Sequence, residues 1–237
     1  MRPQHVVVRN VERSSQATID SLAEIGTATI HEAIGRRGFA GPGLRPIQND
    51  VSIAGSAVTV SCHPGDNLMI HAAVEVCRPG DVLVVTNTAP STHGMFGELL
   101  AGSLMARGVR GLVIDAGVRD TRELRAMGFP VWSQHVSCEG TVKATAGSVN
   151  VPVVLCGQIV RGGDVVLCDD DGVVVVPREE AAEAVALGRN RLEKESASRA
   201  RLNSGELGID VYGMRDTLAK LGVVYLDTLD DSGHGAG

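Results

Sequence analysis

The stretch HGMFGELLAGSLMARGVRGLVIDAGVRD, residues 93–120, decides the fold that we expect, because it carries one complete α/β unit. Residues 98–107 have the length and apolar content of a helix that ends at Gly108. Residues 112–115 are typical of a buried strand, and Gly117 supplies the turn that follows it. The start of the helix and the end of the strand can therefore meet at one rim of a sheet.

That rim gathers groups with a chemical use. The first amides of a helix lack intrahelical acceptors and can bind a small carboxylate. Here they belong to Gly97, Glu98, Leu99 and Leu100. Arg119 offers a bidentate donor for a carboxylate or a developing enolate oxygen. Asp120 provides a hard oxygen ligand and Glu98 a second, directly or through water, which suits Mg²⁺ or Mn²⁺ better than zinc.

A purely structural interpretation of the same residues has equal weight. Asp120 is followed by Thr121, Arg122 and Glu123, so it is also a good helix N-cap with a glutamate at the third helical position. Arg119 could simply pair with a nearby carboxylate. The residues alone leave cap and site open as alternatives.

The stretch resembles the RraA-like family, whose aldolase members carry an acidic residue, twenty intervening residues and then Arg-Asp. Glu98, Arg119 and Asp120 match that pattern position by position. Many relatives have Asp where Glu98 stands, which changes the distance from the backbone to a metal. The resemblance also covers GDNLMIHAAVEVCRPGDVLVV (65–85), GDVVLCDDDGVVVVP (163–177) and GIDVYGMRDTLAKLGVVYLD (208–227).

Within the family, the chain looks most like the 4-carboxy-4-hydroxy-2-oxoadipate / 4-hydroxy-4-methyl-2-oxoglutarate aldolases of aromatic-compound catabolism. The resemblance implies divalent-metal-dependent retro-aldol cleavage to pyruvate plus oxaloacetate or pyruvate, with oxaloacetate decarboxylase activity. Asp120 would hold Mg²⁺ or Mn²⁺, Glu98 would act through water, and Arg119 would stabilise the pyruvate enolate. A metal-associated water is our preferred base for the C4 hydroxyl.

Two alternatives to this aldolase stay open. One is a non-catalytic RraA-type regulator that binds RNase E, which predicts a shorter chain and an incomplete acidic/Arg/Asp set. The other is a different metal-dependent keto-acid decarboxylase. The sequence does not choose between a carboxylate and a methyl group at C4 of the substrate, or between the two metals.

The order of elements predicts an α/β fold, because strands and helices alternate early and strands dominate late. The resemblance implies a layered β/β/α, swivelling-domain-like core over residues 1–177. We expect strands at 53–61, 82–86, 112–115, 131–133, 151–156, 165–168 and 173–176. We expect helices from Ser14 or Ser15 to Glu24 and at 27–36, 67–77 and 98–107.

After Pro177 the composition changes. Residues 178–201 are rich in Ala, Glu and Arg, and form a helix with only an incomplete apolar stripe. A short helix at 214–221, a strand at 223–226 and a frayed end at 230–237 should follow. A helix packed on its own core is the simpler interpretation of the segment. The family aldolases form trimers paired into hexamers, which implies that 178–237 is a subunit-bridging arm.

The family also implies that a neighbouring subunit supplies an acidic residue near the metal. Glu193 and Glu195 are the candidates, and they cannot share a helix face because they are two positions apart. Counting along the family pattern favours Glu195. A solvated helix charge is the structural alternative for either residue.

Asn67 and His71 are separated by one helical turn and can reach one pocket, where they would contact the distal carboxylates of a long substrate. A capping Asn and a partly buried His are the structural alternative. Lys143 is a weaker candidate for the same pocket, in a context that does not suggest a Schiff base.

Other motifs point to structure. His31-Glu32 lacks the second histidine of a zinc protease. Residues 169–172, Asp-Asp-Asp-Gly, predict a hairpin turn and not a calcium loop. Ser91, Thr92 and His93 lack the GxSxG context of a nucleophile elbow.

Composition limits the partners and the compartment. A net charge of −6 and a pI near 5.6 give no electrostatic case for binding nucleic acid or membranes. We expect five reduced, mostly core cysteines, with no zinc spacing among them. No stretch resembles a signal peptide or a membrane span, so we expect a cytoplasmic protein that acts on a small α-keto acid.

Overall fold

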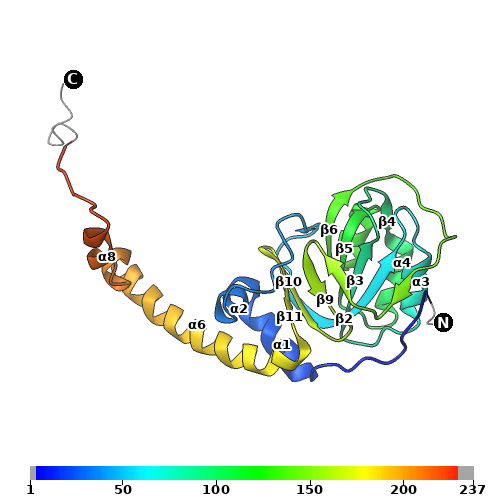
Figure 1. The fold of residues 1–237 in the computed structure, drawn as a ribbon, viewed down its shortest axis with the longest axis horizontal. Coiled ribbons are helices and arrows are strands. Elements are labelled where there is room, and N and C mark those ends of the chain that lie inside the picture. Colours follow the sequence, from blue (N-terminus) through cyan, green and yellow to red (C-terminus); the bar gives the residue numbers. More distant parts are fainter. Residues whose placement is uncertain (1–3, 229–237) are drawn as a thin grey trace. The chain divides into compact units, whose positions relative to one another are not determined.

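The computed structural model describes residues 4–228, and the chain forms two compact units, Met1–Arg191 and Leu192–Gly237. In the described part of the first unit, nine strands make one sheet (Figure 1). Seven of them follow the path β1-β6-β5-β3-β2-β10-β11, and two lie off this path. The strands on that path are β1 (Arg45–Pro46), β6 (Val131–Val136), β5 (Gly111–Val118), β3 (Asp81–Asn87), β2 (Ile53–Cys62), β10 (Val165–Asp169) and β11 (Gly172–Val176). β4 (Gly94–Phe96) adds to β5, and β7 (Ser148–Val149) adds to β2.

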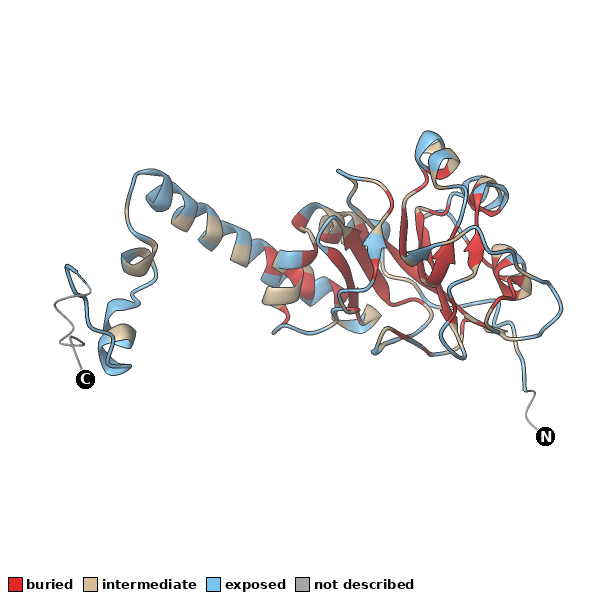
Figure 2. Ribbon diagram, turned by 90° about the horizontal axis from the view of Figure 1, so that it is seen from above, coloured by how far each residue is buried: buried red, intermediate tan, exposed pale blue. Residues whose placement is uncertain are grey.

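The four central strands β2, β3, β5 and β6 are parallel. Parallel strands are covered on both faces and are therefore apolar almost throughout. In β3, Leu83 and Val85 face one apolar cluster while Val82 and Val84 face another, as the two-residue period of a strand requires. Figure 2 shows this burial concentrated in the strands.

The sheet curves until its two ends are joined by one segment, residues 38–46. At one end of this segment, Ala40 donates its amide to the Val173 carbonyl of β11, and at the other Pro46 pairs with Trp132 of β6. Gly38 allows the contact with β11, because its φ is +80° and a Cβ there would collide with the Val175 carbonyl. The result is a nearly closed, barrel-like sheet whose apolar interior includes the single Trp132.

Two groups of helices cover the outside of the sheet. α3 (Leu68–Val74), α4 (Glu98–Met105) and α5 (Thr121–Met127) bury apolar side chains with the central parallel strands. α1 (Gln16–Ile25), α2 (Thr27–Ala33) and the first turns of α6 (Ala181–Asn203) cover β10 and β11. Ser15 caps α1 by accepting the Thr18 amide, as the sequence predicts. The α/β fold with layered elements is thus confirmed.

Several boundaries differ from the predictions. The strand expected at 151–156 is shorter, β8 (Val153–Leu155), and pairs with an unpredicted β9 (Gln158–Val160). The predicted turn at 169–172 is confirmed, since Asp169 pairs with Gly172 where β10 meets β11. The cysteines are all free, but Cys138 is exposed and so does not fit the expected core placement. Among residues 4–228, no helix has the length and apolarity needed to cross a membrane.

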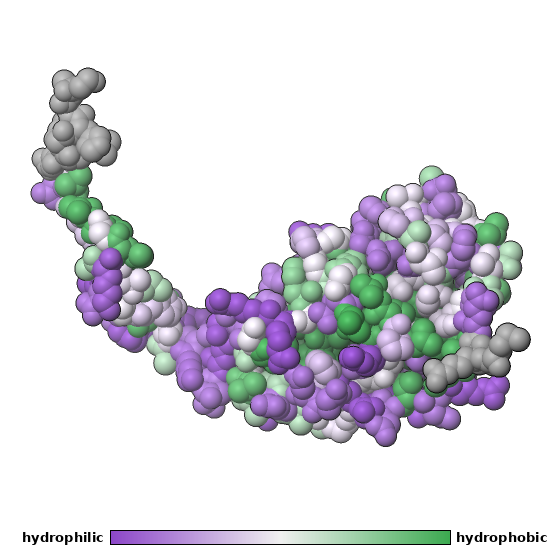
Figure 3. All heavy atoms as spheres, viewed as in Figure 1, coloured by the Kyte–Doolittle hydropathy of each residue, from purple (hydrophilic) through white to green (hydrophobic). Residues whose placement is uncertain are grey.

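The described part of the second unit contains the end of α6, then α7 (Gly208–Val211) and α8 (Arg215–Lys220). The predicted short helix is confirmed as α8. The predicted strand at 223–226 is wrong: these residues are exposed coil, because no described strand lies beside them to pair with their backbone. Figure 3 shows apolar atoms at the surface along this last described stretch. The predicted frayed end, 230–237, lies outside the described residues.

Candidate functional site

The candidate site lies where β4, α4, β5 and α5 meet, beyond the carboxyl ends of the parallel strands. β4 pairs with the end of β5, Gly94 opposite Gly117 and Phe96 opposite Val118. Three glycines allow this approach: a Cβ at Gly94, Gly97 or Gly117 would collide with Ser137 O, Asp120 Oδ2 or Thr92 O, respectively. Absence of side chains at these positions therefore brings the start of α4 against Arg119 and Asp120.

Asp120 does not cap its own helix. It occupies the N-cap position of α5, but its φ of 55° and ψ of 37° are left-handed and its side chain makes no capping bond there. A capping side chain needs an extended N-cap backbone to reach the amides ahead of it. Asp120 Oδ2 instead accepts the Glu98 amide of α4 at 3.1 Å, so the predicted α5 capping box is wrong.

Arg119 lies beside that carboxylate. Its amide donates to the Phe96 carbonyl at 2.9 Å, which fixes the backbone, and its Nε is 3.7 Å from Asp120 Oδ2. This ion pair is long and half-exposed, so it consumes little of the guanidinium's capacity to donate hydrogen bonds. The expected pairing of Arg119 with a carboxylate is present, and it does not block an anion-binding role.

The amides of α4 are divided between protein and solvent. Glu98 N is used by Asp120, whereas the described hydrogen bonds show no protein acceptor for Leu99 N or Leu100 N. Leu99 is 85% exposed and still borders the cleft. The predicted anion site therefore loses the Glu98 amide to Asp120, while the amides of Leu99 and Leu100 stay available as donors.

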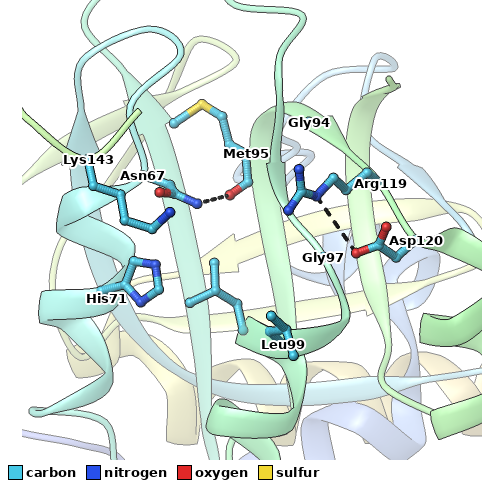
Figure 4. A pocket seen from close by; sticks show the side chains of 10 residues that line it. Asn67, His71, Gly94, Met95, Gly97, Leu99, Arg119, Asp120 and Lys143 are labelled. Atoms are coloured by element: carbon cyan, nitrogen blue, oxygen red, sulfur yellow. Dashed lines mark hydrogen bonds and ion pairs between the residues drawn. The ribbon is translucent and has the colours of Figure 1, made fainter. Parts of the chain in front are cut away.

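Asn67, His71 and Lys143 form the opposite wall (Figure 4). Asn67 is buried and donates its side-chain amide to the Met95 carbonyl at 3.0 Å, which ties the start of α3 to β4. Its other amide atom, Oδ1, is buried without a hydrogen-bond partner. The side chain therefore presents an acceptor, which suits a substrate hydroxyl and not the carboxylate that the sequence suggested.

Lys143 reaches the cleft because a buried carboxylate holds its loop. Asp66 accepts the Ala144 amide at 2.8 Å and the Thr145 amide at 2.7 Å with Oδ2, and the Leu68 amide with Oδ1. Desolvation raises the pKa of Asp66, but these backbone hydrogen bonds outweigh it and the net pKa is lowered. The loop is thus anchored on both sides of the lysine, since Asn67 N also donates to Val142 O.

His71 lies beside Lys143 on this wall. Burial lowers the pKa of His71, and the neighbouring Lys143 charge lowers it further. Both effects favour the neutral imidazole in the free protein, and an anion bound between the two residues would raise the pKa of His71.

The cleft encloses about 140 Å³ and is lined by Asn67, His71, Gly94, Met95, Gly97, Leu99, Leu100, Arg119, Asp120 and Lys143. Figure 4 shows Arg119 and Asp120 on one side of it and His71 and Lys143 on the other. The Glu98 side chain is exposed and is not among the lining residues. His71 and Lys143 therefore lie across the cleft from Arg119 and Asp120. The volume between them suits a small organic acid.

Asp120 could hold a divalent cation in the cleft. Among residues 4–228, no three His, Cys, Asp or Glu side chains cluster as a metal site. Mg²⁺ often binds through one or two carboxylates plus waters and substrate oxygens, whereas a closed zinc site needs three or four protein ligands. The donor set thus fits Mg²⁺ or Mn²⁺ and does not fit structural zinc. Ligand roles for Glu98 and Glu195 stay predictions; Glu193 and Glu195 belong to the second unit.

Sequence reasoning missed part of the wall. Gly94 and Met95 line the cleft although neither carries a chemical group that marks it in the sequence. Lys143, the weaker candidate for this pocket, does line it, and the sequence signal that supports the placement is Asp66, since a buried aspartate before a helix needs backbone donors from another segment.

Comparison with known proteins identifies the family. Residues 27–175 match the model of the RraA-like family, described as Aldolase/RraA, and the chain belongs to that family. A protein of Halalkalibacterium halodurans named "Putative 4-hydroxy-4-methyl-2-oxoglutarate aldolase" is 27% identical over 201 residues, which cover 84% of this chain and 96% of the relative. A Burkholderia multivorans protein with the same name is 34% identical over 134 residues, covering 56% of this chain and 81% of the relative.

A solved structure is also similar to this chain. RraAS2 of Streptomyces coelicolor, described as an unusual member of the RNase ES inhibitor RraA protein family, is 30% identical with a TM-score of 0.72. The match covers 80% of this chain and 99% of that one. The chain therefore shares its fold with relatives that bear an aldolase name and with one that bears an inhibitor name.

Proposed function

We propose that the chain is a divalent-metal-dependent aldolase that cleaves 4-carboxy-4-hydroxy-2-oxoadipate, or 4-hydroxy-4-methyl-2-oxoglutarate, to release pyruvate. The observation that carries the proposal is the single cleft in which Arg119 and Asp120 oppose Asn67, His71 and Lys143. Such a cleft can bind a molecule with anionic groups at both ends. The aldolase names of the relatives support the same reaction class.

The α-keto acid end of the substrate would lie against Arg119 and the α4 amides. C–C cleavage leaves an enolate oxygen on the pyruvate half, and a guanidinium beside that oxygen stabilises the charge as it develops. A divalent cation on Asp120 would act as a Lewis acid on the same keto-acid oxygens. Oxaloacetate loses CO₂ through the same enolate, so this half of the cleft would also support decarboxylation.

The other half of the substrate would lie against the opposite wall. Lys143 and the α3 residue His71 can bind a distal carboxylate, and the unpartnered Oδ1 of Asn67 can accept a hydrogen bond from the C4 hydroxyl. That hydrogen bond would orient the C4–OH for loss of its proton. These roles assign orientation to Asn67 and charge recognition to Lys143.

The test measures pyruvate release from both hydroxy-oxo acids and from oxaloacetate, each with Mg²⁺ and with EDTA. Metal-dependent release from a hydroxy-oxo acid and from oxaloacetate supports the aldolase. Release from oxaloacetate alone would reduce the activity to a decarboxylase. Absence of release from all substrates would reject the enzymatic proposal.

The similarity to RraAS2 favours one second candidate, a non-catalytic regulator of an RNase E-type enzyme. This candidate predicts binding of the chain to RNase E, inhibition of RNA cleavage, and no effect of Arg119→Ala on that inhibition. A pull-down and an RNA cleavage assay with the wild-type chain and with Arg119→Ala separate the two functions.

A further inference from the structure

His93 lies outside the lining of the cleft and joins three segments that build it. Its Nδ1 is 3.3 Å from Ser91 Oγ, and its Nε2 is 3.3 Å from Glu139 Oε1. Ser91 is 8% exposed, and its Oγ also accepts the His93 amide at 3.4 Å. Both contacts hold the hydroxyl within its own loop.

The imidazole ring also lies on the backbone of Gly65. A Cβ at Gly65 would be 3.0 to 3.2 Å from three ring atoms, so the ring fills the place that a side chain would take. Gly65 has a φ of +70°, and its carbonyl accepts the Val142 amide at 3.0 Å. The ring therefore covers the point at which the loop before α3 meets the loop that carries Lys143.

Glu139 completes the junction. Besides the contact of its side chain with the histidine, its carbonyl accepts the Gly94 amide at 2.9 Å. The carboxylate is half-exposed, so its own contribution to stability is modest. What it supplies is a second link between the His93 loop and the Lys143 loop.

Each of the three joined residues precedes a cleft residue by a few positions. Gly65 lies two residues before Asn67, His93 four before Gly97, and Glu139 four before Lys143. Short connections of this kind transmit small displacements of the backbone, and a displacement near 1 Å is enough to impair a site. Movement of the junction would shift the wall that carries Asn67 and Lys143 relative to the start of α4.

We propose that His93, through Gly65 and Glu139, is a positioning residue that sets the distance between Lys143 and Asn67 on one wall and the α4 amides on the other. This inference rests on the proposed function only in its kinetic consequence. The mechanical junction itself exists independently of the reaction.

The kinetic test compares His93→Phe, which keeps a ring over Gly65 but removes both polar links, with His93→Gln, which can keep the link to Glu139. For the hydroxy-oxo acid substrate, we expect His93→Phe to raise KM about tenfold, equivalent to about 1.4 kcal/mol, and to change kcat less than about threefold, because Arg119 and Asp120 stay in place. His93→Gln should recover most of the KM. His63→Phe, at an exposed histidine of the neighbouring loop, is the matched control and should behave as wild type.

Hydrogen exchange gives a readout that does not need activity. In His93→Phe and in Glu139→Ala, which removes the link at an exposed position and so should fold, the amides of Asn67, Val142 and Gly94 should exchange faster together. Exchange that rises only around residues 88–97, or an equal fall of kcat and kcat/KM, would overturn the proposal. If the wild-type protein shows no turnover, the proposed function is rejected. The exchange data would still decide whether the junction exists.

Discussion

At the scale of single residues, Asp120 combines a structural contact with a position in the candidate site. Its carboxylate accepts the Glu98 amide of α4 and also borders the cleft. Asp120→Asn should separate the two, since asparagine tolerates left-handed backbone and can accept the same hydrogen bond without the charge. We expect turnover to fall at least about 100-fold while the melting temperature stays within a few degrees. Metal-dependent pyruvate release and thermal unfolding of the variant check this, and retained activity would remove the ligand role.

Arg119 should be needed for chemistry and not for folding. Its guanidinium is half-exposed and makes one long ion pair, so Arg119→Ala should cost less than about 1 kcal/mol of stability. Loss of the donor to a developing oxyanion should lower kcat by about 100- to 1,000-fold. Arg122→Ala is the control, because Arg122 is 90% exposed and pairs with Glu123. Equal kinetics in the two variants would contradict the assignment.

The pKa of His71 gives a prediction that pH can test. Burial and Lys143 lower this pKa below its ordinary value of 6.5, so the unfolded chain takes up the proton before the folded one as pH falls. The contribution of His71 to stability is therefore present above pH 6.5 and is lost as pH falls toward its folded pKa. NMR titration should show the low pKa, a higher one in Lys143→Met, and a higher one again when a dicarboxylate binds. An unchanged His71 pKa in Lys143→Met would show that the charge of Lys143 does not act on His71.

At the scale of elements, Gly97 is one of the three glycines that let the start of α4 approach Arg119 and Asp120. Gly97→Ala should push the Asp120 carboxylate out of place, because the new Cβ would occupy the position of Oδ2. We expect activity to fall about 100-fold, the effect of a misplacement near 1 Å. Gly102→Ala in the same helix is the control: its nearest neighbour would be Met127 Cε at 3.8 Å, and alanine should stabilise the helix by up to about 1 kcal/mol. Steady-state kinetics and urea unfolding of both variants decide it.

The elements differ in how far their sequences determine them. Valine-rich runs such as β3 and β11 are buried on both faces, and such a run reads as a strand without further information. β1 and β7 are two residues long and exist only because a partner strand lies beside them, so no local pattern marks them. The predicted strand at 223–226 shows the converse: these suitable side chains form no strand, because no strand in the described part of the chain lies beside them.

The candidate site divides in the same way. Glycine 97, Arg119 and Asp120 lie within a single α/β unit, so their spacing in the sequence is enough to place them at one rim. The backbone of Asp120 is left-handed and its carboxylate accepts the Glu98 amide, which is a tertiary contact, whereas the residues alone left a capping role and a site role open. Lys143 depends on Asp66, 77 positions away, and a contact of that range is not encoded in any local motif.

At the scale of the whole molecule, the second unit is the test of assembly. We expect Glu195→Ala and Arg119→Ala each to be inactive if a neighbouring subunit supplies Glu195, and Glu193→Ala to be active. Mixing the two inactive chains should then restore about a quarter of wild-type activity, the share of sites in which random pairing joins an intact Arg119 with an intact Glu195. Activity assays on co-expressed chains measure this. No recovery, with both variants folded, would confine the site to one chain.

The segment at 38–46 decides how two copies of this molecule can meet. Because it pairs with β11 at one end of the sheet path and, through β1, with the first half of β6 at the other, the outer backbone of both stretches already has hydrogen-bond partners. A strand of a second molecule cannot add to the sheet along these stretches without displacing the segment. An assembly that forms over them must therefore rely on side chains, whose chemistry can change from one relative to another without disturbing the barrel.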